Sequence, residues 1–218
     1  MLDFSLVTKY IPYLLEASLV TLEIAVLSIA IGLVLGLITA LVKISGIQPF
    51  AAIADFYIWV TRGTPLLVQI LLVYFGLPQL GIDITPFPAA VLALGVNAGA
   101  YFAEIYRAGI QSIPKGQIEA AQSLGMGYPL IMRRIVLPQA LRVSLPAMGN
   151  ESITLLKDSS LASLVTVTEL MMASQRFAAS NYAFIEFYIT AAVFYLVMTT
   201  FFTFILNKAE KRLSISDR

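Results

Sequence analysis

Cysteine and histidine are both absent from the 218 residues of the chain. Without them the chain can form no disulfide, no thiolate nucleophile and no histidine base, and most zinc sites are excluded. It also lacks the GxxxxGKS or GxxxxGKT loop and the GxGxxG turn that bind nucleotide phosphates. We therefore expect no catalytic residues, no metal ligands and no cofactor in this chain.

Charged residues are scarce, since 12% of the chain is charged and 59% is hydrophobic. A soluble domain usually carries about a quarter charged residues, so this chain has too little polar surface to cover a globule in water. A lipid bilayer is the expected solvent. The net charge of +1 gives no reason to expect nucleic acid as a partner.

Four long stretches between ionisable residues carry no charge at all. They cover residues 24–42, 63–82, 84–103 and 187–206. Each is close to the roughly 20 apolar residues with which a helix crosses about 30 Å of hydrocarbon. These stretches predict four transmembrane helices.

The distribution of basic residues predicts one more crossing. Lys and Arg collect in cytoplasmic loops, and here they gather in 104–142 and again after residue 206, with one charge-free stretch between the two groups. Two loops on the same side need an even number of crossings between them, so part of 139–181 should also cross. We expect an all-α membrane protein with a single domain over 1–218, an outer N-terminus, an inner C-terminus and helices at about 14–43, 52–80, 85–111, 139–160 and 182–207.

The additional crossing contains three charged residues, Glu151, Lys157 and Asp158. A charge at bilayer depth is costly unless it is paired or hydrated, so it usually marks a solute or ion pathway. For Lys157 and Asp158 the alternative is equally good: the two side chains pair with each other beside a break in the helix.

The basic loop between the third and fourth predicted helices carries a spaced motif. It reads EAAQSLGMGYPLIMRRIVLP over residues 119–138. This loop resembles the EAA---G---------I-LP signature of membrane subunits of ATP-binding-cassette importers and matches all its defined positions, which are Glu119, Ala120, Ala121, Gly125, Ile135, Leu137 and Pro138. The alternative is an ordinary amphipathic connecting helix.

Three further segments resemble one particular group of these importers. RGTPLLVQ at 62–69, GVNAGAYFAEIYRAGI at 95–110 and NESITLLKDSSLASLV at 150–165 are similar to the permeases for polar amino acids, the glutamine, histidine and arginine group with the type I importer fold. The resemblance runs from about residue 13 to residue 211. It implies a multi-pass subunit of the bacterial inner membrane that moves polar amino acids by alternating access.

The resemblance also implies partners. Two ATP-binding-cassette ATPase subunits would bind ATP and magnesium, a second permease chain, either identical or a sister chain, would complete the path, and an external solute-binding protein would deliver the amino acid. A coupling helix at about 116–127 would fit a groove in the ATPase through Glu119, Ala120, Ala121 and Gly125. We expect this helix to start near Gln117, with Glu119 in its first turn, where a carboxylate complements the positive end of the helix dipole. We expect Gly125 and Gly127 to adopt the left-handed conformation that ends helices.

Candidate substrate contacts are polar side chains inside apolar helices. Asn97, Tyr101 and Glu104 share one helix face by their spacing, as do Glu151, Thr154 and Asp158, and Glu23 adds a carboxylate to the first helix. Because acidic candidates outnumber basic ones, we hypothesise that basic amino acids such as arginine, lysine or histidine are preferred.

Each of these residues also has a structural interpretation. Asn97 can make a hydrogen bond between helices, Glu104 can pair with Arg107, Glu23 can pair with a neighbouring helix, and Tyr101 can be simple packing. Arg62 is expected to anchor the inner interface. At the level of function, the alternative is a secondary transporter driven by an ion gradient, which would need inverted repeats that the sequence does not display.

Overall fold

The computed structural model describes residues 3–214, and every regular element within them is helical. The longer helices are α2 (Ile11–Ile44), α3 (Gln48–Gly63), α6 (Pro86–Gln111), α9 (Leu137–Asp158), α10 (Leu170–Asn181) and α11 (Phe184–Ser214). The shorter ones are α1 (Ser5–Thr8), α4 (Leu66–Leu71), α5 (Leu77–Gln79), α7 (Lys115–Ser123) and α8 (Tyr128–Ile131). Two π-helical turns, η1 (Leu72–Gly76) and η2 (Met132–Val136), and a 3₁₀ segment, η3 (Ser159–Val165), join them.

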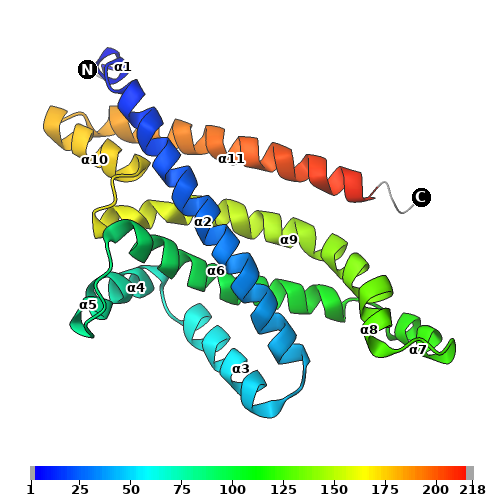
Figure 1. Cartoon of the computed structure of the whole chain (residues 1–218). Helices are drawn as coiled ribbons and strands as arrows, with labels where there is room; N and C mark the ends of the chain where they lie inside the picture. The colour runs from blue at the N-terminus through cyan, green and yellow to red at the C-terminus, as the bar shows by residue number, and fades with distance from the viewer. Residues whose placement is uncertain (1–2, 215–218) are drawn as a thin grey trace.

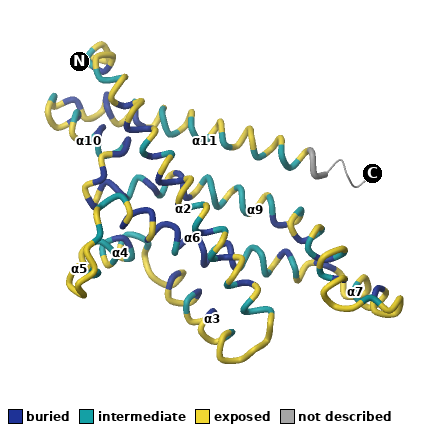
Figure 2. The backbone as a smooth tube through the Cα atoms, in the orientation of Figure 1, coloured by how far each residue is buried: buried dark blue, intermediate teal, exposed yellow. Residues whose placement is uncertain are grey.

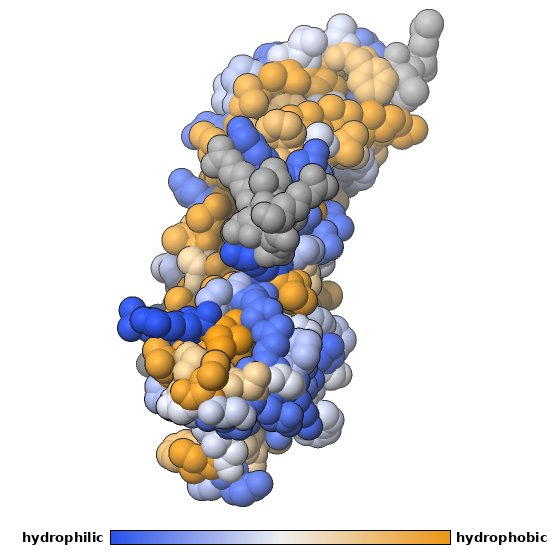
Figure 3. Space-filling model, turned by 90° about the vertical axis from the view of Figure 1, so that its right-hand side faces the viewer, coloured by the Kyte–Doolittle hydropathy of each residue, from blue (hydrophilic) through white to orange (hydrophobic). Residues whose placement is uncertain are grey.

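Different helices lie at the two ends of the molecule. Helix α7 protrudes at one end, toward which the C-terminal part of α11 also runs, whereas α1 and α10 lie at the opposite end (Figure 1). Seen from the end that carries α7, hydrophilic side chains lie across the middle of the surface (Figure 3). The side of the membrane that each end faces stays a prediction.

Three helices are long and apolar enough to cross a membrane, namely α2, α6 and α11. The pair formed by α3 and residues 66–79 adds a fourth if its two bent halves belong to one span. Helix α9 is not among them, because charged and polar residues interrupt its apolar sequence. The crossing at 139–160 therefore stays a prediction that rests on the distribution of basic residues.

The segment predicted as one helix over 52–80 is instead bent by 107° between α3 and α4. Thr64 and Pro65 have extended backbones at the bend, because proline has no N–H and disfavours a helical conformation in the residue before it. The amide of Gln69 holds the bend by donating to the Thr61 carbonyl at 2.7 Å and to Thr64 Oγ1 at 2.9 Å. Local sequence chemistry thus turns α4 away from α3.

Helix α6 is the centre of the molecule. In its most apolar stretch 67% of the residues are buried, against 11% in α11, and its buried turns run through the middle of the tube in Figure 2. Most of its buried side chains are alanine or glycine. Small residues let helix backbones approach closely, which is how helices pack inside membranes.

One such close approach lies where α2 crosses α6. A Cβ placed on Gly36 would lie 2.6 Å from the Cβ of Phe102 and 3.0 Å from the backbone nitrogen of Ala103. No side chain larger than hydrogen fits there without moving one of the two helices.

At the opposite end, Glu169 joins three helices although it is completely buried. Its carboxylate accepts hydrogen bonds from the backbone N–H groups of Met171 and Met172, at 2.9 and 2.8 Å, at the start of α10. It also accepts one from the Tyr195 hydroxyl of α11 at 3.0 Å and lies 3.3 Å from the Thr21 hydroxyl of α2. These bonds fix α10 against α2 and α11.

Gly36→Ala tests the packing of α2 on α6. We expect it to lower the free energy of unfolding by about 1–3 kcal/mol, the usual cost of overpacking a filled contact. The measurement is denaturant unfolding in mixed detergent micelles. Gly76→Ala is the control, because a Cβ there meets no atom within 4 Å, and it should be neutral or stabilising by about 0.4–1 kcal/mol. Equal effects of both variants would contradict the close approach.

Candidate functional site

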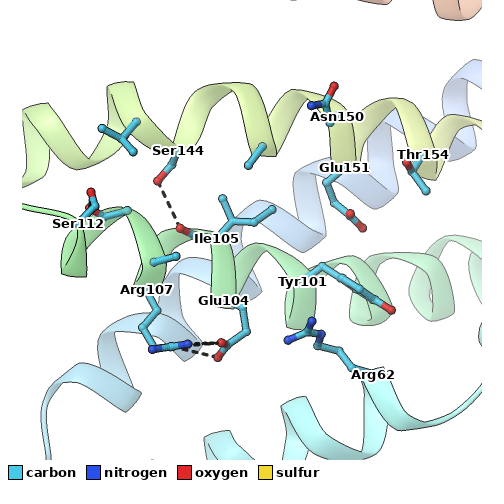
Figure 4. A pocket seen from close by; sticks show the side chains of 14 residues that line it. Arg62, Tyr101, Glu104, Ile105, Arg107, Ser112, Ser144, Asn150, Glu151 and Thr154 are labelled. Atoms are coloured by element: carbon cyan, nitrogen blue, oxygen red, sulfur yellow. Dashed lines mark hydrogen bonds and ion pairs between the residues drawn. The ribbon is translucent and has the colours of Figure 1, made fainter.

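A groove of about 810 Å³ runs between α6 and α9 and reaches the end of α3. We call it the α6–α9 groove. Its lining is Arg62 from α3, residues 101–112 of α6 in part, and the facing side chains of α9 between Val143 and Thr154. Cavities of this size are typical of small-molecule sites. Figure 4 shows the polar side chains from the two helices facing each other across it.

One part of the groove wall holds a compensated cluster of charges. Glu104 binds Arg107, whose Nε lies 3.1 Å from Oε2 and 3.2 Å from Oε1. Glu104 also lies 2.9 Å from Lys43 Nζ of α2, which in turn lies 2.8 Å from Asp55 of α3. The pairing of Glu104 with Arg107 confirms the structural interpretation of Glu104, and the cluster ties α2, α3 and α6 together.

Elsewhere along the groove, charges face each other without pairing. The guanidinium carbon of Arg62 lies 5.1 Å from the ring centre of Tyr101, in a cation–π contact. Glu151 of α9 points into the same part of the groove, with Thr154 beside it (Figure 4). No hydrogen bond or ion pair joins Glu151 to any residue that the structure describes. Arg62 therefore belongs to the groove lining, and its expected role as an anchor at the inner interface stays a prediction.

The predicted substrate residues divide into two groups. Tyr101, Glu104, Glu151 and Thr154 line the groove, and the structure brings them together from two helices. The others lie outside it: Asn97 is buried and donates to Gln69 Oε1 at 3.1 Å, Asp158 is half-buried at the end of α9, and Glu23 is exposed on α2. The hydrogen bond of Asn97 confirms its interpretation as a link between helices.

Helix α7 coincides with the motif loop but begins earlier than predicted. It starts at Lys115, directly after the extended Pro114, so Glu119 lies in the second turn and the prediction of a first-turn position is wrong. Pro114 is the last residue before the helix. Because the first backbone N–H groups of a helix have no partner within it, the N–H that proline lacks is not missed at this position. Glu119 therefore lies farther from the positive end of the helix than expected.

Two glycines after α7, Gly125 and Gly127, were predicted to be left-handed, and only Gly125 is. Gly125 has φ of +78°, its N–H donates to the Gln122 carbonyl at 2.9 Å, and the N–H of Met126 donates to the Ala121 carbonyl at 3.1 Å. This is the Schellman arrangement that closes helices. Gly127 has φ of −70° and starts α8, so the left-handed prediction for Gly127 is wrong.

The motif residues on α7 face two ways. Ala121 is buried in a cluster with Ile113, Ile131, Val136 and Ala140, which fixes α7 on the ends of α6 and α9. Glu119 and Ala120 are exposed. Leu124 at the tip of the helix is 82% exposed. An apolar side chain presented this far from the body of the protein is typical of a docking surface.

Two polar residues that organise the structure were not identified from the sequence. Gln69 lies inside one of the segments noted above, yet nothing in its local pattern indicates that it bridges a bend. Glu169 immediately precedes Leu170, the first residue of α10. A carboxylate before an apolar helical run is a capping signal, and it could have revealed this residue.

Residues 8–215 match the protein family described as "Binding-protein-dependent transport system inner membrane component". The chain belongs to this family. The resemblance carried by the motif loop is thereby confirmed, and with it a multi-pass protein of the inner membrane with an all-helical permease fold.

Named relatives of the family cover almost the whole chain. It is 46% identical over 217 residues to the arginine transport system permease protein ArtQ of Bacillus subtilis, with 99% of both chains covered. It is 41% identical over 215 residues to the glutamine transport system permease protein GlnP of Escherichia coli K12, with 98% of both covered. A crystal structure of an amino acid ABC transporter with histidines superposes with a TM-score of 0.93 at 44% identity, covering 97% of this chain and 99% of that one.

A double-mutant cycle tests the charge cluster. Glu104→Gln and Lys43→Met should couple by about 0.5–1 kcal/mol in unfolding free energy, because the pair is partly exposed but belongs to a network. Glu104→Gln combined with Lys157→Met, which lies on the face of α9 toward α11, is the control and should be additive within about 0.3–0.5 kcal/mol. Additivity in the first pair would contradict an energetic link between α2 and α6 here.

Proposed function

We propose that this chain is the permease subunit of an ATP-driven importer that moves polar amino acids across the bacterial inner membrane by alternating access. The observation that carries the proposal is the exposed helix α7, which presents the family signature at one end of the molecule. The relatives named as arginine and glutamine permeases support the class of solute.

Partners follow from the same proposal. Two ATPase subunits bind ATP and magnesium and dock on α7 of this chain and of a second permease chain, which is identical or a sister chain. The second chain closes the open side of the α6–α9 groove, and an external solute-binding protein delivers the amino acid. The name of the family, which refers to dependence on a binding protein, supports the last of these partners.

The docking surface for the ATPase is the exposed side of α7 and of the turn that follows. Glu119 and Ala120 supply a carboxylate and a small side chain, while Leu124 and the 57% exposed Tyr128 supply apolar contacts. Ala121 acts from beneath by seating the helix on the buried cluster at its base. A push on α7 is thereby passed to the ends of α6 and α9.

The preference for basic amino acids stays a prediction, and fewer carboxylates support it than the sequence suggested. Glu151 is the only carboxylate among the groove-lining residues that is free of an ion pair, because Glu104 is already bound by Arg107 and Lys43. Asp158 and Glu23 do not line the groove. A preference for a cationic side chain would therefore depend mainly on Glu151.

Glu119→Lys tests the docking role of α7. We expect the variant to insert and fold normally, because the side chain is exposed, while ATP-dependent uptake in proteoliposomes falls at least about 10-fold through the reversed charge at the interface. Measurements of uptake and of ATP hydrolysis by the same complex separate coupling from assembly. Normal coupled uptake by Glu119→Lys would refute the role, and uptake without any ATPase would favour a transporter driven by an ion gradient.

Gly125 and Gly127 form a matched pair for testing the shape of the helix end. Gly125→Ala should cost about 1–2 kcal/mol, since an L-residue is strained at positive φ, and should reduce coupled uptake; Gly127→Ala should leave uptake unchanged. Gly125→Pro should abolish coupling, because proline cannot adopt φ of +78° or donate to Gln122. ATP hydrolysis and uptake are measured together, and equal behaviour of the two alanine variants would contradict the requirement for this turn.

A further inference from the structure

A second groove, of about 470 Å³, lies between α2, α9 and α11. Its walls are apolar side chains from residues 26–33 of α2, 145–153 of α9 and 202–209 of α11. We call it the α2–α9–α11 groove. Its one polar lining side chain, Ser152, already donates its hydroxyl to the Met148 carbonyl at 2.8 Å. The groove therefore suits hydrocarbon, because a polar solute would lose its hydration there without gaining side-chain partners.

The length and direction of the groove match one leaflet of a bilayer. At a rise of about 1.5 Å per residue the three lining stretches are roughly 10–12 Å long. One leaflet is half of the roughly 30 Å of hydrocarbon, or about 15 Å. Leu33, Leu145 and Ala209 line the part of the groove nearest the end of the molecule that carries α7, and the rest extends toward the middle (Figure 1). An extended acyl chain can thus lie along it.

Helix α11 forms one wall of the groove because it rests on α9 at a glycine. Leu206 of α11 packs so closely on Gly149 that a Cβ there would clash with its side chain. Both residues line the groove. The contact closes the groove at its base, so that it is a cleft between helices and differs from the open lipid-facing surface of α11.

Two cations flank the end of the groove nearest α7. Lys208 of α11 and Arg142 of α9 each lie within one helical turn of a residue that lines it. Lys208 is exposed and forms no ion pair with any residue in 3–214. The acid nearest in sequence, Glu210, is followed by Lys211, so this end of α11 keeps a net positive charge. Basic residues between membrane helices at the cytoplasmic side are typical of sites for anionic lipid head groups.

We propose that the α2–α9–α11 groove binds one acyl chain of an anionic phospholipid, whose head group lies against Lys208 and Arg142. The apolar walls select the chain, and the two cations select an anionic over a zwitterionic head group. The proposal goes beyond the proposed function, since it holds whichever solute the chain moves. A lipid held in this way would fix the C-terminal half of α11 against α2 and α9.

The two faces of α9 distinguish this lipid from a second permease chain. Val143 and Ala147 line the α6–α9 groove, whereas Leu145 and Gly149 line the α2–α9–α11 groove. On a helix with 3.6 residues per turn these two sets lie on nearly opposite sides. In the proposed importer the second chain closes the α6–α9 groove, and this one step of the argument rests on that proposal. The α2–α9–α11 groove is then left facing lipid.

The test is lipid binding to the full chain, purified in detergent micelles and titrated with lipid in native mass spectrometry. The probes are dioleoylphosphatidylglycerol, which is anionic, and dioleoylphosphatidylcholine, which has the same acyl chains and a zwitterionic head group. The wild type should bind the anionic lipid at least about 5-fold more tightly, as expected for one or more cations close to the head group.

One pair of variants tests the head group and another tests the acyl chain. Lys208→Gln should weaken the anionic lipid by about 5-fold and leave the zwitterionic lipid unchanged; Lys9→Gln, at an exposed lysine near the opposite end, is its matched control. Ala30→Trp fills the groove from α2 and should weaken the anionic lipid at least about 5-fold. Ala52→Trp is the control for bulk, since Ala52 is exposed on α3 and outside the groove.

Three results would overturn the proposal. The first is equal wild-type affinity for the two lipids, and the second is equal binding by the members of either variant pair. The third concerns a second permease chain as the occupant. Because the chain has no cysteine, Ile205→Cys gives a single thiol on the groove wall. In phosphatidylglycerol vesicles it should react with a lipid-soluble maleimide, and protection would show that protein covers the groove.

Discussion

The close approach of backbones along α6 is the constraint on which the rest of the structure depends. Inside a membrane, lipid tails are as apolar as leucine, so helices are held together by contact at short range more than by the hydrophobic effect. Gly36 meets Phe102 where α2 crosses α6, and Gly109 meets Ser144 and the Ala140 carbonyl where α9 does. A Cβ at Gly109 would lie 2.9 Å from that carbonyl oxygen. These contacts set the distance between the walls of the groove.

The charges of the groove follow from this arrangement and serve two different purposes. Lys43, Asp55, Glu104 and Arg107 compensate one another and tie three helices together where α2, α3 and α6 meet. Arg62 and Glu151 line the same groove from α3 and α9 and form no ion pair with each other. Glu104 and Glu151 are thus the same residue type on facing helices, yet only Glu104 is ion-paired and joins helices.

Much of the architecture was predictable because local chemistry determines it. Charge-free stretches located α2, α6 and α11, and the glycine at the end of the motif helix predicted the left-handed turn that Gly125 adopts. The start of α7 was misplaced by two residues because Pro114, rather than Gly116, marks the boundary. Pro65 could have predicted the bend between α3 and α4. The sequence instead predicted one continuous helix, because residues 63–82 carry no charge.

The site was only partly predictable, because a helix face does not determine what covers it. Asn97, Tyr101 and Glu104 do share a face of α6 by their spacing, yet Gln69 from the bent α4 covers Asn97 while the groove opens over the other two. Arg62 and Glu151 are 89 residues apart in the chain, and only the crossing of α3 and α9 over α6 brings them to one groove. Such partners depend on tertiary packing, which no local pattern encodes.

The position of α7 explains how motion at the surface can reach this groove. The cluster of Ile113, Ala121, Ile131 and Val136 joins α7 to the end of α6 and, through η2, to the start of α9. Because α6 and α9 are in direct contact at Gly109, next to that cluster, we expect a displacement of α7 to move both walls of the groove together. In the proposed importer, access to the α6–α9 groove would then change through movement of this pair relative to the second permease chain, while the ion pairs of Lys43 with Asp55 and Glu104 keep α3 attached to α6.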